Sequence, residues 1–178
     1  SELLKEVSLI KETKQLGTGG AIKNYLKQAE APENDLIIVN GDTIFNFSHD
    51  VKNADFDVDL IFGVQSKGNE NDFGVMKVAK NGKILQFSEK PKRQLSTNNN
   101  FKYLINAGIY FFKSRTLNKF SSMPECFSLE NDFWKHPKYV EELYSFEYID
   151  NFFDVGTEQR LEAFSEAGYD ILRKSCDN

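Results

Sequence analysis

The feature that most constrains the fold of this chain is an unbroken apolar run, Leu36-Ile37-Ile38-Val39, which stops at Asn40-Gly41-Asp42. A run of apolar residues without polar alternation predicts a strand that is buried on both faces of a parallel sheet. The polar residues at its carboxyl end then lie at the edge where open α/β sheets bind ligands. The run therefore favours an α/β protein with a site near Asp42.

Strand and helix signals alternate on both sides of this run. Val7-Ser8-Leu9-Ile10 predicts a short strand, and a helix with apolar residues at helical spacing is expected from Ala21 until Pro32 closes it. Residues 58–64 predict a further strand. The alternation is typical of an α/β fold with a mixed, mainly parallel central sheet flanked by helices, similar to a Rossmann fold.

The second half of the chain predicts a hairpin followed by isolated elements. Asn81-Gly82 lies between two strand-like segments and favours a type I′ turn, which needs positive φ at both residues. Ser128 is expected to cap a short helix that runs through Trp134. The remaining predicted elements are strands over 104–112 and 143–149 and a terminal amphipathic helix over 158–172.

Size and charge narrow the function classes. At 178 residues the chain is expected to form a single domain, 1–178, with its own core. A net charge of −5 gives no general attraction to nucleic acid or anionic lipid, and no apolar run approaches the roughly 20 residues that span a bilayer. Cys126 and Cys176 have no paired spacing, which favours reduced thiols and a cytoplasmic protein.

Two aspartates are candidates for binding a metal ion. Asp42 follows the apolar run, and Asp154 follows two phenylalanines and precedes Gly156 and Thr157. Carboxylates that converge on one Mg²⁺ suit a reaction on phosphates, because the metal neutralises charge and holds the oxygens in line. The alternatives are that Gly41-Asp42 is an ordinary turn and that Thr157 caps the last helix.

Three further motifs are candidates for ligand contacts. The glycine-rich turn Leu16-Gly17-Thr18-Gly19-Gly20-Ala21 can present backbone N–H groups to a base or an anion, or it can be a tight connection. Glu89-Lys90-Pro91 offers a charge for a phosphate and an acceptor for hydroxyls, unless it is a solvated pair. Asn106-Ala107-Gly108 interrupts an apolar strand, as a ligand site or a bulge does.

The order of these motifs resembles that of sugar-1-phosphate nucleotidyltransferases. LGTGGA, NGD, FGV, EKP, NAGIYFF, ENDFW and DVGT follow one another between Leu16 and Thr157. LGTGGA with VNGD is most similar to guanylyltransferases of manno-configured sugar 1-phosphates, in particular the D-glycero-α-D-manno-heptose 1-phosphate and mannose 1-phosphate types.

The resemblance implies a role for each matching residue. It implies nucleotide contacts from Gly17, Thr18, Gly19, Gly41 and Asp42, and Mg²⁺ binding by Asp42 and Asp154. It implies that the sugar phosphate is held by Gly74, Glu89, Lys90, Asn106 and Gly108. Asp42, Asp154 and Lys90 would be the catalytic residues. The implied reaction is attack by a sugar 1-phosphate on the α-phosphorus of a nucleoside triphosphate, with release of pyrophosphate.

One family motif does not occur in the sequence. The family begins with a strand and a GGxGTR-type loop that cradles the β- and γ-phosphates, and the chain contains no such loop. About 70 residues of the family pattern are unmatched, judged by the usual size of such a start. The chain is therefore expected to be N-terminally incomplete, inactive by itself, and to work with a separate N-terminal segment or as a homo-oligomer.

Two other functions fit the same motifs. One is a thymidylyl- or uridylyltransferase for a hexose 1-phosphate, which differs in the contacts to the base. The other is a non-catalytic regulatory module that binds a sugar nucleotide without turnover. Binding assays with the four triphosphates distinguish the first, and a turnover assay distinguishes the second.

Overall fold

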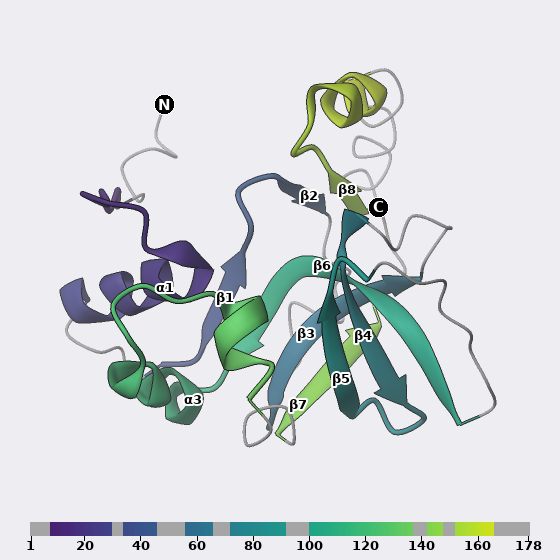
Figure 1. Ribbon diagram of the computed structural model, residues 1–178, viewed down its shortest axis with the longest axis horizontal. Helices are drawn as coiled ribbons and strands as arrows, with labels where there is room; N and C mark the ends of the chain where they lie inside the picture. The colour runs from purple at the N-terminus through teal and green to yellow at the C-terminus, as the bar shows by residue number, and fades with distance from the viewer. Residues whose placement is uncertain are drawn as a thin grey trace.

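The computed structural model describes residues 8–29, 34–45, 56–65, 72–91, 100–136, 142–147 and 152–165. The main sheet has the strand order β5-β4-β6-β3-β7, with β1 also paired to β6, and a second, two-stranded sheet joins β2 to β8. Figure 1 shows the small sheet above one end of the main sheet. The strands are β1 (Leu36–Val39), β2 (Thr43–Phe45), β3 (Asp59–Gln65), β4 (Gly74–Ala79), β5 (Ile84–Glu89), β6 (Phe101–Phe112), β7 (Leu143–Glu147) and β8 (Phe152–Asp154).

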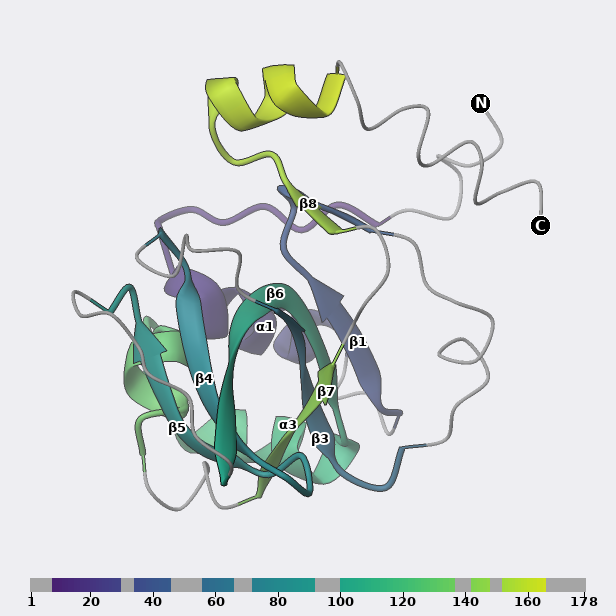
Figure 2. The same ribbon diagram turned by 90° about the vertical axis from the view of Figure 1, so that its right-hand side faces the viewer.

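The long strand β6 organises the sheet. One edge of β6 pairs with β4 through Ile105 and with β1 from Ile109 onward, while the other edge pairs with β3. Residues 106–108 thus lie between the last residue of β6 that pairs with β4, Ile105, and the first that pairs with β1, Ile109. Figure 2 shows β6 arching across the molecule at this level. The arch leaves a stretch of β6 backbone that no strand of the described chain covers on that edge.

The strand directions differ from the expected mainly parallel sheet. The mixed sheet with flanking helices is confirmed, but among the described strands only β3 and β7 pair in parallel; every other pairing is antiparallel. The reason is local: β4 and β5 form a hairpin, and β6 runs opposite to β1, β3 and β4. β1 is also not buried on both faces, since Ile37 is 56% exposed.

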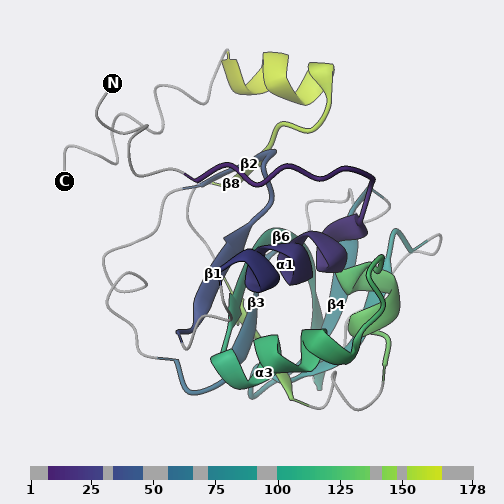
Figure 3. The same cartoon turned by 90° about the vertical axis from the view of Figure 1, so that its left-hand side faces the viewer.

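Four helical segments of the described chain pack on one face of the main sheet. Helix α1 (Gly17–Gln28), helix α3 (Ser114–Lys119), the 3₁₀ turn η3 (Phe120–Ser122) and the π-helical turn η4 (Leu129–Phe133) lie along that face, with α1 and α3 in front of the sheet in Figure 3. Buried aromatic residues from η3, η4 and β6 form the larger core there. A smaller core of Leu60, Phe62, Ala107 and Ile109 covers the opposite face.

Two local predictions at the start of the chain are wrong. Of the predicted strand over 7–10, Val7 lies outside the described residues. Residues 8–10 form no strand, because they have no hydrogen-bonded partner in the described chain, and Leu9 is 94% exposed. The helix begins at Gly17 rather than at Ala21. Its first turn is anchored from outside, since the carbonyl of Phe127 accepts from the N–H groups of Gly19 and Gly20.

The hairpin is confirmed, but its turn is of another type. Gly82 has a φ of +84°, whereas Asn81 has no positive φ, so the turn is not type I′. The N–H of Gly82 donates to Ala79 O at 3.0 Å and that of Ala79 to Lys83 O at 2.9 Å. This is the pattern of a type I turn followed by a glycine bulge, which also twists the strands correctly.

The later elements follow the predictions where the structure describes them. Ser128 caps η4 by accepting from the N–H of Asn131 at 3.1 Å, and β7 lies within the predicted strand over 143–149. Residues 158–165 are helical; the rest of the predicted terminal helix and Cys176 lie outside the described residues. No helix in the described part of the chain is long and apolar enough to cross a bilayer.

Candidate functional site

The small sheet brings the two predicted metal-binding aspartates together. Thr43 of β2 pairs with Asp154 of β8, and the N–H of Val155 donates to Asp42 O at 2.9 Å. A Cβ atom added to Gly156 would lie 2.6 Å from Asp42 Oδ2 and 3.3 Å from Asp154 Oδ1. An oxygen of each carboxylate therefore lies close to one point, beside Gly156.

The carboxylates of Asp42 and Asp154 differ in their partners. Asp154 Oδ1 accepts from the N–H of Gly156 at 3.0 Å and from Arg160 Nη1 at 3.0 Å. The Asp42 side chain has no hydrogen-bond partner among the described residues, and it is exposed. The Thr157 hydroxyl accepts from the N–H of Arg160 at 3.3 Å, so its predicted capping role is confirmed.

The Asn40–Asp42 turn is docked on the uncovered stretch of β6. The N–H of Asn40 donates to Gly108 O at 2.8 Å, and the Thr43 hydroxyl donates to Ala107 O at 3.3 Å. Gly108 has a φ of +70°, and a Cβ there would lie 2.6 Å from Asn40 Nδ2. Asn106 caps the bend by accepting from the N–H of Gly108 at 3.0 Å. The structure therefore joins the NGD and NAG motifs directly.

Gly41 differs from the other glycines of the site. Its φ is not positive, and an added Cβ would have no atom of the chain within 4 Å. Neither the backbone conformation nor internal packing requires glycine at this position. A ligand that approaches the backbone closely would require it, which is the reason for keeping Gly41 among the predicted contacts.

The EKP motif lies beside Gly74 at the adjoining ends of β4 and β5. Gly74 pairs with Glu89, and a Cβ on Gly74 would lie 2.9 Å from Glu89 Oε2. Lys90 has a φ of 45°, the left-handed conformation that few side chains of this size adopt, and its N–H donates to Phe73 O at 3.0 Å. Strained residues of this kind gather at binding and catalytic sites.

Sequence reasoning did not single out Tyr110, which contacts the NAG motif. Tyr110 is buried, and its hydroxyl accepts from Asn106 Nδ2 at 3.0 Å. Burial raises the pKa of Tyr110, and the nearby carboxylates of Glu130 and Glu89 add to the shift. Burial also raises the pKa of Glu89, as does the negative charge of Glu130. Tyr110 is therefore held by the amide of the NAG motif, and the charges of Glu89 and Glu130 act on it.

The glycine-rich turn is occupied by internal contacts. A Cβ on Gly19 would lie 2.1 Å from the ring of Phe127, and one on Gly17 would lie 2.7 Å from the Phe127 carbonyl oxygen. The N–H groups of Gly19 and Gly20 both donate to that carbonyl at 3.1 Å. The turn is thus the tight connection that was the alternative interpretation, and these two N–H groups already have partners. Nucleotide contacts by Gly17 and Gly19 remain a prediction.

Thr18 reaches toward the acidic turn η4. Its hydroxyl donates to Glu130 Oε2 at 2.7 Å and accepts from the N–H of Leu129 at 2.9 Å. Ser128 also donates to Glu130, at 2.6 Å. Glu130 therefore has two hydroxyl partners, and its charge also raises the pKa of Tyr110. An acidic residue at a helix start has a local explanation in the sequence, and this second role became visible only in three dimensions.

The acid pair fits a hard divalent cation bound partly by its substrate. No group of three or more His, Cys, Asp or Glu side chains in the described residues could hold a metal ion by itself. Mg²⁺ is commonly bound by one or two carboxylates together with substrate phosphates and water. Two convergent carboxylates, one of them without a protein partner, are a suitable donor set for that arrangement.

Comparisons with known proteins find relatives of this chain by sequence. The sequence model of the nucleotidyl transferase family matches residues 2–173. The bifunctional protein GlmU of Methanococcus maripaludis strain S2 is 38% identical over 109 residues, which are 59% of this chain and 23% of that protein. The D-glycero-α-D-manno-heptose 1-phosphate guanylyltransferase of Aneurinibacillus thermoaerophilus is 26% identical over 148 residues, or 82% of this chain and 60% of the relative.

A solved structure gives the same fold. HddC from Yersinia pseudotuberculosis superposes with a TM-score of 0.66 at 25% identity, covering 91% of this chain and 69% of that one. The same protein has also been solved in complex with GMP-PN, with a TM-score of 0.65 and 24% identity over the same shares. The chain spans 23% of the length of GlmU and 60% of the length of the guanylyltransferase relative.

Proposed function

Because the chain belongs to the nucleotidyl transferase family, we propose that it serves the transfer of a nucleotidyl group from a nucleoside triphosphate, GTP in the first place, to a sugar 1-phosphate. The products are a nucleotide sugar and pyrophosphate. The observation that carries the proposal is the convergence of Asp42 and Asp154 on the space beside Gly156. We also propose a cytoplasmic location, in keeping with the free, exposed thiol of Cys126.

The acid pair is assigned to magnesium. Asp42 and Asp154 would hold Mg²⁺, which would neutralise the charge of the reacting phosphates. The open space over Gly41 lets a nucleotide approach the backbone beside Asp42. The residues of the chain therefore bind and orient the α-phosphate region.

The sugar phosphate is assigned to the adjoining ends of β4 and β5. The ammonium group of Lys90 would pair with the phosphate, and the backbone of Lys90 is left-handed at this point. Glu89 would accept from a sugar hydroxyl, and Gly74 leaves room beside it. Because burial raises the pKa of Glu89, this contact depends on pH in the acidic range.

The choice of GTP is supported by the guanylyltransferase relative and by the structural neighbour solved with GMP-PN. Other relatives bear other names, among them the glucose-1-phosphate adenylyltransferase of Ruminiclostridium cellulolyticum, 29% identical over 78% of this chain and 33% of its own length. A thermal-shift screen of four triphosphates, each with Mg²⁺ and with EDTA, tests the assignment. The largest magnesium-dependent stabilisation is expected with GTP; stabilisation by none of them would contradict the proposal.

Turnover is a separate measurement. Pyrophosphate release with GTP, Mg²⁺ and heptose or mannose 1-phosphate reports the transfer itself. We expect these 178 residues alone to turn over at less than about 1 s⁻¹, because they contain no glycine-rich loop with an arginine for the β- and γ-phosphates. Binding of a nucleotide sugar without turnover, even with such a loop supplied, would favour a regulatory module instead.

Lys90→Ala tests the sugar-phosphate side. Loss of a charge-assisted contact should weaken binding of the sugar 1-phosphate by roughly 1.5–3 kcal/mol. Calorimetry with mannose 1-phosphate measures it, and Lys80→Ala, at an exposed position of the β4–β5 turn, is the matched control. Equal affinities for both variants would show that Lys90 is a solvated surface lysine.

A further inference from the structure

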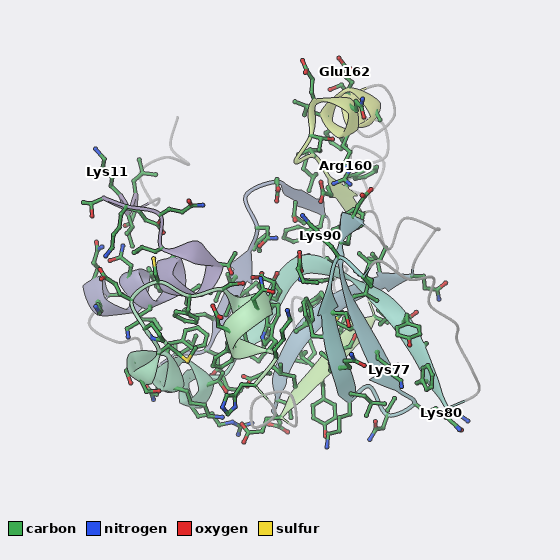
Figure 4. All side chains as sticks on the ribbon, viewed as in Figure 1. Lys11, Lys77, Lys80, Lys90, Arg160 and Glu162 are labelled. Carbon is green, nitrogen blue, oxygen red and sulfur yellow. The ribbon has the colours of Figure 1, made fainter. Side chains whose placement is uncertain are left out.

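Arg160 lies at the junction of three segments of the proposed site. Its Nη1 is 3.0 Å from Asp154 Oδ1, its Nη2 is 3.3 Å from Asp72 Oδ2, and its guanidinium lies over the ring of Phe73 at 4.7 Å from the centroid. The side chain is 31% exposed. In Figure 4, Arg160 lies between the small sheet and the ends of β4 and β5, in the region of Lys90.

The contacts on Asp154 are unequal between its two oxygens. Oδ1 accepts from both the N–H of Gly156 and Arg160 Nη1, at 3.0 Å each. Neither Asp154 Oδ2 nor the carboxylate of Asp42 has a hydrogen-bond partner in the described part of the chain. Two donors on one oxygen fix the rotation of the carboxylate and leave the other oxygen available. This is the arrangement by which outer partners orient a metal ligand.

Arg160 is itself held from several directions. Its N–H donates to the capping hydroxyl of Thr157, so its backbone is fixed at the start of the helical residues 158–165. The ring of Phe73 packs against the guanidinium, and Asp72 holds the remaining nitrogen. The carbonyl of Phe73 in turn accepts from the N–H of Lys90. One side chain thereby connects the aspartate pair with the backbone of the EKP motif.

We propose that Arg160 is a positioning residue that holds Asp154 in its metal-binding orientation. It also fixes the distance between that carboxylate and the hydrogen-bonded backbone of Phe73 and Lys90. The inference rests on the proposed metal site. It differs from the opposite possibility, in which the guanidinium competes with the cation for Asp154. The two possibilities predict opposite signs: removal of Arg160 weakens metal binding in the first and strengthens it in the second.

The test is a titration with Mn²⁺, followed by loss of the free-ion EPR signal, on the chain and four variants. Each titration is run with saturating GMP, because two carboxylates need a phosphate ligand to complete the site, and GMP without protein is the blank. Arg160→Gln should weaken Mn²⁺ binding by roughly 10- to 100-fold, the range for loss of an outer partner of a metal ligand. Arg160→Lys keeps the charge but loses the fork, and should recover part of this loss. Asp72→Asn spares the contact between Arg160 and Asp154, so it should change the affinity for Mn²⁺ by less than about threefold.

The fourth variant separates failure of this inference from failure of the metal site. Asp42→Asn should lose most Mn²⁺ binding. If it does so while Arg160→Gln binds Mn²⁺ as well as or better than the unaltered chain, the positioning role is overturned and the metal site stands. If the unaltered chain binds no Mn²⁺, both are overturned. Circular dichroism and the unfolding temperature of each variant show that a lost affinity is not a lost fold.

Discussion

Two pairs of aspartates in this molecule, Asp35 with Asp59 and Asp42 with Asp154, differ in how far their carboxylates are hydrogen-bonded within the chain. Asp35 and Asp59 are consumed by the start of α3: Asp35 accepts from the N–H of Ser114 and from Lys113 Nζ, and Asp59 accepts from the N–H of Lys113 and from the Thr116 hydroxyl. Asp42 has no such partner in the described chain. Protein donors on both oxygens turn a carboxylate into a structural part, whereas Asp42 keeps both oxygens, and Asp154 one oxygen, without a donor in the described chain.

The same contrast separates the two glycine-bearing turns. The turn at Gly17–Gly20 is filled by Phe127, whose carbonyl takes two of its N–H groups. Gly41 has open space where a side chain would be. The two turns therefore differ in how much of their glycine is explained by packing within the chain.

The largest effect is expected for Asp42→Asn. Loss of a direct metal ligand should lower the affinity for GTP in the presence of Mg²⁺ by about 100-fold, above the usual cost of an outer partner. The free energy of unfolding should change by less than about 0.5 kcal/mol, since the side chain has no described partner to lose. Calorimetry and urea unfolding measure the two quantities. A large loss of stability with unchanged affinity would reverse the comparison.

Asp59→Ala is expected to act in the opposite sense. It leaves the N–H of Lys113 and the buried hydroxyl of Thr116 without their acceptor, at a cost of about 2–3 kcal/mol in the free energy of unfolding. Burial raises the pKa of Asp59, so relief of the buried charge offsets part of that cost at neutral pH. The affinity for Mg²⁺ and nucleotide should stay the same. Asp59→Asn, which keeps one acceptor, is the matched control and should cost less.

The two turns can be compared with one substitution each. Gly19→Ala places a Cβ against the Phe127 ring and should destabilise the chain by about 2 kcal/mol through overpacking. Gly41→Ala enters open space and should leave the chain as stable or slightly more so, by up to about 1 kcal/mol. Urea unfolding measures both. Equal losses of stability would remove the distinction between a packed and an open turn.

The smallest effect concerns acid stability. The hydrogen bond from Lys113 and that from the Ser114 N–H hold the pKa of Asp35 below its usual value. A lowered folded-state pKa adds stability above the unfolded-state pKa of about 4, and this is lost as pH falls through the folded-state value. Asp35→Asn should therefore cost less than about 1 kcal/mol near pH 7, because the pair is partly exposed. The difference between the two chains should vanish near pH 2.

Several elements could be predicted from local pattern, but their environment could not. The apolar run 36–39 does form a strand, yet it pairs antiparallel with β6 and exposes Ile37, because burial depends on which neighbours a strand meets. The turn at Asn81-Gly82 is where the residues favour it, but Asn81 keeps a negative φ. Its type was set by the strands that it joins.

The candidate site could be predicted only because its motifs follow one another in the order found in sugar-1-phosphate nucleotidyltransferases. That order paired Asp42 with Asp154 across more than a hundred residues, and the small sheet brings them together. Arg160 and Tyr110 had no comparable signal. Arg160 is an ordinary charged residue of a predicted helix, and Tyr110 an ordinary aromatic of a predicted strand.

The sequence by itself determined that this chain builds a mixed α/β sheet, where most strands lie, and which family its motifs fit. Only the tertiary structure decided which polar groups are already used. Phe127 occupies the glycine-rich turn, α3 consumes Asp35 and Asp59, and Arg160 takes one oxygen of Asp154. The physical reason is that a hydrogen-bonding group can serve a ligand only if the folded chain has not satisfied it, and its partners come from residues far away in sequence.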